Sequence, residues 1–190
     1  LHDRDLDLLD YIIKLVDGWK YPNEDLKIIK RDWEYINQKI KDGKAHELSE
    51  GDTFYLGACT KGSTALKSYR DQPFNKEQAK QRAYSLKQGY VNHIIANIAQ
   101  EETAVYGKII DRPEVLDKVQ SLEEIVILKF HPFYGKSAEK IEQELGLDLN
   151  QKAKSYFANL TNSILGLELG QKIEEFEKAD IQVKTIRLKE

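Results

Sequence analysis

Hydrophobic residues recur every three or four positions between residues 23 and 43, which predicts one amphipathic helix. We expect Asn23 to cap its start and Gly43 to mark its end. The preceding residues 8–19 fit either a helix face or a buried strand, and Pro22 ends either one. The buried stripe of the helix should contain five apolar residues: Leu26, Ile29, Trp33, Ile36 and Ile40.

The next part of the chain alternates between strand-like and helix-like patterns. Residues 53–58 are apolar and aromatic, which predicts a strand that follows a turn. Residues 75–86 are expected to form a helix that passes into a short extended piece, and residues 89–100 to form another helix. This order of elements predicts a mixed α/β fold.

The periodic pattern of hydrophobic residues is lost around Pro113, and we therefore expect a domain boundary near Asp117. The first domain then covers residues 1–117 and the second covers residues 118–190. In the second domain, Ser121 with Glu124 forms a capping box, and Ser137 should begin the next helix. The end of the chain alternates apolar and polar positions, which predicts a final strand. Its apolar positions are Ile181, Val183, Ile186 and Leu188.

Composition narrows the class of protein. No apolar run approaches the roughly 20 residues that span a membrane, so no membrane partner is expected. Cys59 is the single cysteine, which excludes an internal disulfide and fits a reducing compartment such as the cytoplasm. The four histidines are scattered singly and predict no zinc site. The chain contains no methionine and ends on a predicted edge strand, so we expect a piece of a longer protein.

Charge is unevenly distributed along the chain. The net charge is −3, but residues 59–97 contain seven basic and two acidic residues, a local balance of +5 that leaves −8 elsewhere. Aromatic and hydroxyl side chains are interleaved with these cations, which favours a surface that binds a polyanion. A solvated helical face is the alternative interpretation of the same pattern.

The stretch "DTFYLGACTKGST", residues 52–64, is compatible with three kinds of site. A phosphate-binding loop needs a lysine after its second glycine, whereas here Lys61 precedes Gly62. A nucleophilic Cys59 needs a histidine base, and nothing in the sequence pairs His46 or His93 with it. The remaining interpretation is a loop that contacts DNA or RNA, with Lys61 on a phosphate or a base edge.

Three segments resemble the MutH mismatch-repair nuclease family, and most closely its two-domain type II restriction endonucleases that cut GATC. These are "IIKRDWEYINQKIKDGKAHELSEGDTFYLGACTKGST", "QAKQRAYSLKQGYV" and "EEFEKADIQVKT". The resemblance implies a restriction-endonuclease-like PD-(D/E)xK fold and Mg²⁺-dependent cleavage of double-stranded DNA. The D…E-x-K motif of such enzymes lies before the segment that resembles "DWEYINQ". We therefore expect this chain to contain only partial copies of the MutH-like fold. The catalytic N-terminal half of the first copy is missing, and residues 1–117 form its DNA-reading half. This chain itself is expected to bind no Mg²⁺.

The resemblance also implies which residues contact DNA. The base-reading loop falls on Cys59, Thr60 and Lys61, followed by Gly62 and Ser63, and a second contact segment contains Tyr84, Ser85 and Lys87. Only Lys61 keeps its residue type relative to the mismatch-repair branch, where arginine replaces Cys59 and tyrosine replaces Ser85. A homodimer on DNA is compatible with this resemblance.

Residues 118–190 resemble the beginning of a second, degenerate MutH-like domain. In that alignment Gln182 replaces the glutamate of E-x-K, Lys184 keeps the lysine, Glu175 takes the place of the aspartate, and Asn162 replaces a further carboxylate. Amide oxygens lack the charge that a hard dication requires, so no Mg²⁺ site is expected here.

Three functions remain open from the sequence. The chain is a non-catalytic DNA-recognition portion of such an endonuclease, an enzyme completed by another chain or domain, or a structural and oligomerising piece without DNA contact. The two part-domains are expected either to complement each other as one permuted core or to dock as two lobes.

Overall fold

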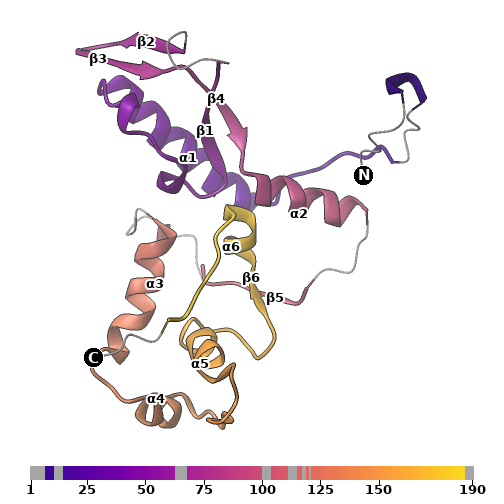
Figure 1. The fold of residues 1–190 in the computed structure, drawn as a ribbon, viewed down its shortest axis with the longest axis vertical. Helices are drawn as coiled ribbons and strands as arrows, with labels where there is room; N and C mark the ends of the chain where they lie inside the picture. The colour runs from indigo at the N-terminus through magenta and orange to yellow at the C-terminus, as the bar shows by residue number, and fades with distance from the viewer. Residues whose placement is uncertain are drawn as a thin grey trace.

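The computed structural model describes residues 7–10, 15–62, 68–99, 104–110, 115–116, 119 and 121–186, and every structural statement below concerns these residues. Helices and short two-stranded sheets are mixed along the chain, which confirms the predicted α/β character (Figure 1). The sheets pair β1 with β4, β2 with β3, and β5 with β6.

Helix α1 (Asn23–Lys41) confirms the first predicted helix, although Pro22 rather than Asn23 is the capping residue. Its predicted stripe is wrong at Leu26, Trp33 and Ile40, which are exposed, whereas Ile36 is buried as predicted. The buried residues of the helix are Asp25, Ile28, Asp32 and Ile36. Two carboxylates can be buried here because partners distant in the sequence satisfy them, which periodicity alone does not reveal.

The segment before α1 forms neither of the predicted elements over its described part. A single 3₁₀ turn, η1, covers Leu8–Asp10, residues 11–14 lie outside the described residues, and residues 15–22 are irregular. Val16 is 82% exposed, so this apolar run has no core to enter here.

The region after α1 is built from strands rather than the predicted helix. Strand β1 (Leu56–Thr60) begins three residues later than expected and pairs antiparallel with β4 (Arg82–Leu86). Between them, β2 (Tyr69–Gln72) and β3 (Asn75–Lys80) form a hairpin. The helix expected at the start of residues 75–86 is therefore wrong, whereas the extended piece expected after it is confirmed as β4. Helix propensity is a weak local preference, and here pairing with β1 and β2 overrides it.

Short 3₁₀ turns, η2 (Ala45–Glu47) and η3 (Glu50–Asp52), connect α1 to β1. Helix α2 (Gln88–Ile98) confirms the helix predicted after the strands. Strand β5 (Tyr106–Gly107) follows, then helix α3 (Leu122–Phe130), the 3₁₀ turn η6 (His131–Phe133), and helices α4 (Ala138–Leu145) and α5 (Tyr156–Ile164). The chain closes with β6 (Lys172–Ile173), which pairs parallel with β5, and with α6 (Glu174–Ala179).

The predicted cap at Ser137 is confirmed, and at Ser121 the serine half of the predicted capping box is confirmed. The Ser121 hydroxyl accepts the Glu124 N–H, and the Ser137 hydroxyl accepts the Lys140 N–H. The predicted final strand is wrong over residues 181–186, which are irregular and exposed, while Leu188 lies outside the described residues. An alternating pattern forms a strand only where a neighbouring strand is available to pair with it.

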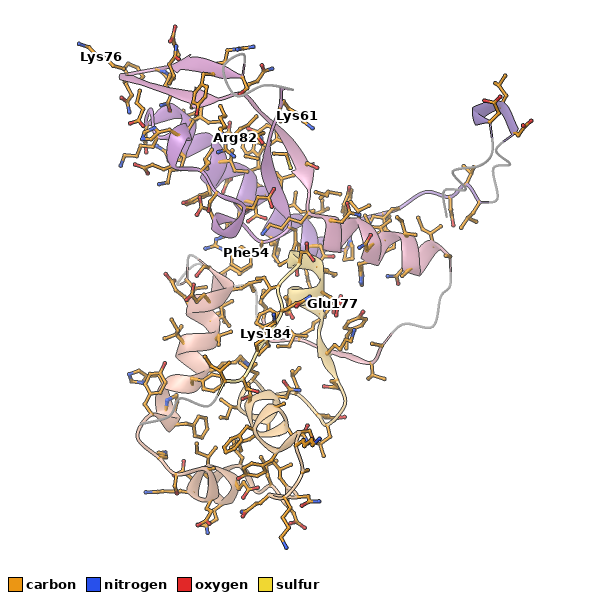
Figure 2. All side chains as sticks on the ribbon, viewed as in Figure 1. Phe54, Lys61, Lys76, Arg82, Glu177 and Lys184 are labelled. Atoms are coloured by element: carbon orange, nitrogen blue, oxygen red, sulfur yellow. The ribbon has the colours of Figure 1, made fainter. Side chains whose placement is uncertain are left out.

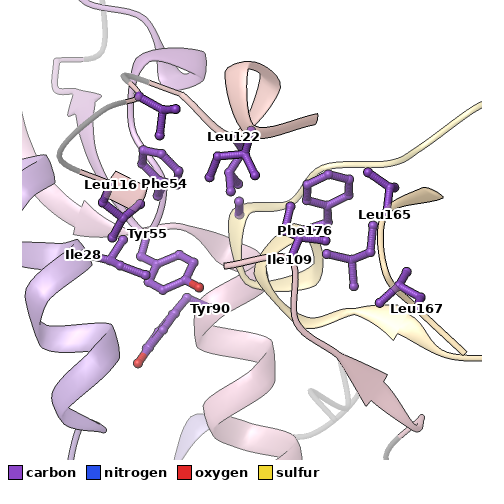
Figure 3. Packing of buried hydrophobic residues seen from close by; sticks show 14 residues of the cluster. Ile28, Phe54, Tyr55, Tyr90, Ile109, Leu116, Leu122, Leu165, Leu167 and Phe176 are labelled. Carbon is purple, nitrogen blue, oxygen red and sulfur yellow. The ribbon is translucent and has the colours of Figure 1, made fainter. Parts of the chain in front are cut away.

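One hydrophobic core joins the two sides of the predicted boundary near Asp117, a residue that itself lies outside the described ones. From the first part the core takes Ile28, Phe54, Tyr55, Tyr90, Ile109 and Leu116; from the second it takes Val119, Leu122, Ile125, Leu165, Leu167, Ile173, Phe176 and Ala179 (Figure 3). A smaller cluster contains Ile36, Ala45, Leu48, Ala58 and Ala79, and another joins α4 to α5. The two parts therefore share one hydrophobic core. Their assignment to two copies of a MutH-like domain stays a prediction.

Buried polar contacts also join α6 to the first part of the chain. The Lys178 ammonium lies 2.8 Å from Asp25 and 2.7 Å from Glu174, and the Tyr90 hydroxyl donates to Asp25. Helices α2 and α6 approach closely at Gly89, where a Cβ atom would lie 2.0 Å from the Glu177 carbonyl oxygen. These contacts fix α6 beside α1 and α2.

Candidate nucleic-acid interface

The paired strands β1 and β4 present two different faces. Ala58 lies opposite Tyr84, and this face turns towards α1, where the Tyr84 hydroxyl donates to Asn37 at 3.0 Å. Side chains alternate along a strand, so Cys59 and Ser85 lie on the other face. That second face forms one wall of a cavity of about 380 Å³ lined by Glu50, Gly51, Gly57, Cys59, Ser85, Leu86, Lys87, Gln88, Ala179, Asp180 and Ile181. The structure thus brings Cys59, Ser85 and Lys87 together and separates Tyr84 from them.

The start of β1 is fixed by a buried carboxylate. Asp32 is 2% exposed, and its two oxygens accept the backbone N–H groups of Phe54, Tyr55 and Leu56 at 2.9, 2.6 and 2.9 Å. Burial raises the pKa of Asp32, whereas the three N–H donors and the nearby Lys87 ammonium act in the opposite direction. Asp32 therefore sets where the strand that carries Cys59 leaves the core.

Two cations of the basic segment, residues 59–97, donate hydrogen bonds to backbone carbonyl oxygens of the protein itself. The Lys87 ammonium donates to the Thr53 carbonyl oxygen, and burial lowers its pKa against the opposing effect of Asp32. The Arg82 guanidinium donates to the carbonyl oxygens of Ala58 and Leu48 at 2.8 and 2.6 Å. In this structure the charge of Lys87 faces inward, although its side chain lines the cavity.

The remaining cations of the described segment are exposed. Lys61 follows β1, and its backbone N–H donates to the Gln81 carbonyl at 2.8 Å. The Arg70 guanidinium donates to the Gln81 side chain at 2.7 Å, and Lys80 directly precedes Gln81. Three cations therefore gather where the hairpin joins the β1–β4 pair, and Figure 2 shows Lys61 at this end of the strands. The alternative interpretation as a helical face is wrong, because strands and their connections carry these cations.

The predicted loop is only partly described. Thr60 and Lys61 are exposed at the end of β1. Gly62 has φ +116°, and a Cβ atom there would lie 2.8 Å from the Cβ of Ser68. Ser63 lies outside the described residues. Glycine is thus required here by the positive φ and by the close approach of Ser68, and neither feature makes this segment a phosphate-binding loop.

The histidines proposed as bases for Cys59 have other partners. His46 lies 3.0 Å from the Gln72 amide and 3.3 Å from the Glu77 carboxylate. His93 packs against the rings of Trp19, Tyr90 and Tyr106. These contacts count against a cysteine nucleophile.

The four residues of the predicted degenerate nuclease site do not form one site. Both Glu175 oxygens accept the Ile109 N–H at 3.1 Å, and one also accepts the Ile110 N–H. Gln182 lines one pocket with Asn162 and a second pocket with Lys184, and Glu175 lines neither of them. These residues do not fit Mg²⁺, because Glu175, their one carboxylate, is buried and already accepts backbone N–H groups. Across the described part of the chain, no group of three or more acidic, histidine or cysteine side chains is arranged to hold a metal ion.

Sequence reasoning missed the contribution of the hairpin. The sequence assigned residues 75–86 largely to a helix, and so it separated Lys80 and Gln81 from Arg70 and Lys61. The dipeptide Pro73-Phe74 between two polar, alternating segments was the available signal for a hairpin turn.

The site defines the chain as a mixed α/β protein with a cluster of cations where the hairpin joins the β1–β4 pair, beside a cavity of mixed polar and apolar lining. Models of known protein families do not match this sequence. The chain is 41% identical over 170 residues to the type II restriction enzyme Sau3AI of Staphylococcus aureus, a match that covers 85% of this chain and 34% of that enzyme. The chain thus spans about a third of the length of this relative. This similarity supports a relationship to restriction endonucleases. Over its described residues, no helix combines the length and the apolar character needed to cross a bilayer.

Proposed function

We propose that this chain is a DNA-recognition portion of a MutH-like type II restriction endonuclease and that it contacts double-stranded DNA at GATC. The proposal depends chiefly on one observation: Lys61, Arg70 and Lys80 gather, exposed, at the open end of strands in a chain that is 41% identical to a restriction enzyme. Phosphate contacts of this kind supply most of the sequence-independent affinity for DNA.

The face that carries Cys59 and Ser85 is the candidate for reading bases. Its wall contains Gly57, Cys59 and Ser85, which are small enough to let a base edge come close to the strands. The Ser85 hydroxyl donates to the Leu86 carbonyl at 3.1 Å and also has lone pairs that can accept a hydrogen bond. Lys61, at the end of the same strand, is suited to a guanine edge or to a phosphate.

We propose further that the chain binds without cutting. In the parent enzyme Mg²⁺ would be held by the D…E-x-K motif of the catalytic half, and the degenerate site here does not fit the ion. A homodimer on DNA belongs to the same proposal, because GATC is a two-fold symmetric site that two copies could read alike.

Binding of a GATC duplex and a scrambled duplex, measured by fluorescence anisotropy over a range of salt concentrations, tests the proposal. Lys61→Ala is expected to weaken GATC binding by about 1–3 kcal/mol if Lys61 contacts a base, and to weaken both duplexes equally if it contacts phosphate. Lys152→Ala is the matched control, because Lys152 is exposed between α4 and α5, away from the interface. Salt-independent binding, or no binding by the unaltered chain, would contradict the proposal.

A structural or oligomerising role is the alternative. It is favoured by the exposed apolar side of α1, where Leu26, Trp33 and Ile40 lie seven residues apart on one stripe. A chain that fails to bind either duplex but forms dimers in light scattering, with Trp33→Ser dissociating them, would support this alternative.

A further inference from the structure

The tip of the β2–β3 hairpin carries an exposed aromatic side chain in an unfavourable backbone conformation. Gln72 pairs with Asn75, which leaves Pro73 and Phe74 as a two-residue loop. Phe74 has φ +61° and is 96% exposed. Proline fixes the first loop position, and the second position then favours glycine or asparagine, because a positive φ brings a Cβ atom close to the backbone. Folding alone therefore favours a different residue at this position.

The backbone around Phe74 is held firmly, although its ring is not packed. The Asn75 side-chain amide donates to the Gly43 carbonyl at 2.9 Å, and the Gln72 side chain accepts the Ala45 N–H at 2.7 Å. Gly43, with φ +69°, is required there because a Cβ atom would lie 2.5 Å from the Pro73 carbonyl oxygen. The turn is thus anchored to the loop after α1 and presents the Phe74 side chain to the outside.

The hairpin also has the shape of a DNA-binding ribbon and a small positive net charge. Arg70, Lys76 and Lys80 are exposed along its two strands, against Asp71 and Glu77. The hairpin forms one extremity of the molecule, and Figure 2 shows Lys76 reaching outward there. A two-stranded ribbon fits the width of a DNA groove, and proteins that deform DNA insert apolar side chains between base steps.

We infer that Phe74 is an apolar wedge that inserts at a base step of duplex DNA while the hairpin lies along the duplex. This inference rests on the proposed DNA-binding function and assigns to the hairpin a contact separate from Lys61, Cys59 and Ser85. The cost of holding a phenylalanine at positive φ is then offset by stacking in the complex, and the anchored turn keeps the Phe74 backbone in place before DNA arrives.

Duplexes that contain 2-aminopurine at successive positions within and beside GATC test the inference, because this base fluoresces more strongly when it is unstacked. The unaltered chain is expected to raise the fluorescence at one or two adjacent positions. Phe74→Gly should abolish the rise and weaken binding by about tenfold, the loss expected for one base–aromatic stack. Since glycine accepts the positive φ, the melting temperature of this variant should be unchanged or higher.

Two further variants separate a wedge from a general apolar contact. Phe74→Leu retains an apolar wedge and should keep most of the fluorescence rise. Phe157→Ala removes another exposed aromatic ring, on α5, and should change neither fluorescence nor affinity.

The outcomes distinguish this inference from the proposed function. If the unaltered chain binds and Lys61→Ala weakens binding, but Phe74→Gly binds as the unaltered chain does, the wedge is overturned and DNA binding stands. An equal loss in Phe157→Ala, or no fluorescence rise at any position, also overturns the wedge. A chain that binds no duplex at all overturns both.

Discussion

Replacing Asp32 by asparagine is expected to destabilise the fold far more than its small change in shape suggests. The carboxylate accepts three backbone N–H groups, from Phe54, Tyr55 and Leu56, in a site that is almost fully buried. An asparagine carbonyl oxygen can serve two of these donors, and its amide then points N–H groups towards the third. One buried N–H is left unpaired, and the other two lose the assistance of the negative charge.

The magnitude follows from these contacts. An unpaired buried donor costs about 1–3 kcal/mol, and two hydrogen bonds that lose charge assistance cost about 1 kcal/mol each. The neutral side chain regains part of the desolvation cost, because burial already raises the pKa of Asp32. The net loss is expected at about 2–3 kcal/mol, a large part of the roughly 5–15 kcal/mol that stabilises a typical domain.

Urea unfolding followed by circular dichroism measures this loss. With a slope of about 2 kcal/mol per molar urea, Asp32→Asn should lower the midpoint by about 1–1.5 M. Asp42→Asn is the matched control, since Asp42 is exposed at the end of the same helix and accepts only the Gln38 amide, which asparagine also does. A midpoint for Asp32→Asn within about 0.2 M of this control would refute the role assigned to the carboxylate.

Two further predictions concern α2. Gly89→Ala should lower the midpoint of urea unfolding, because its Cβ atom would lie 2.0 Å from the Glu177 carbonyl oxygen. Gly18→Ala is the control and should leave the midpoint unchanged, because nothing lies within 4 Å of a Cβ atom there. Equal midpoints for the two variants would show that α2 and α6 do not pack this closely. Burial and the Lys178 ammonium lower the pKa of His93, so the unfolded chain takes up a proton near pH 6.5 that the folded chain resists. Stability should therefore fall as pH drops below about 6.5, and His93→Gln should flatten the melting temperature between pH 8 and 5; parallel curves would contradict this.

Some features of the structure could be predicted from local sequence alone. The caps at Ser121 and Ser137, and the helices α1 and α2, follow from side chains within one turn of each other. The excess of cations in residues 59–97 could also be predicted, because it follows from the residue types alone.

Other features depend on residues that are far apart in the chain. Which cations are exposed was decided by distant carbonyls: Arg82 reaches Leu48, 34 residues away, and Lys87 reaches Thr53. The hairpin replaced a predicted helix because strand pairing outweighs a weak local preference.

The sequence by itself determined the helices α1 and α2, the serine caps, the polarised charge and the likeness to a restriction enzyme. Only the tertiary structure decided that Asp25 and Lys178, 153 residues apart, form a buried pair and that one core spans both parts. The physical reason is that periodicity records whether a side chain is apolar, whereas burial of a charge depends on a partner that the fold must bring to it.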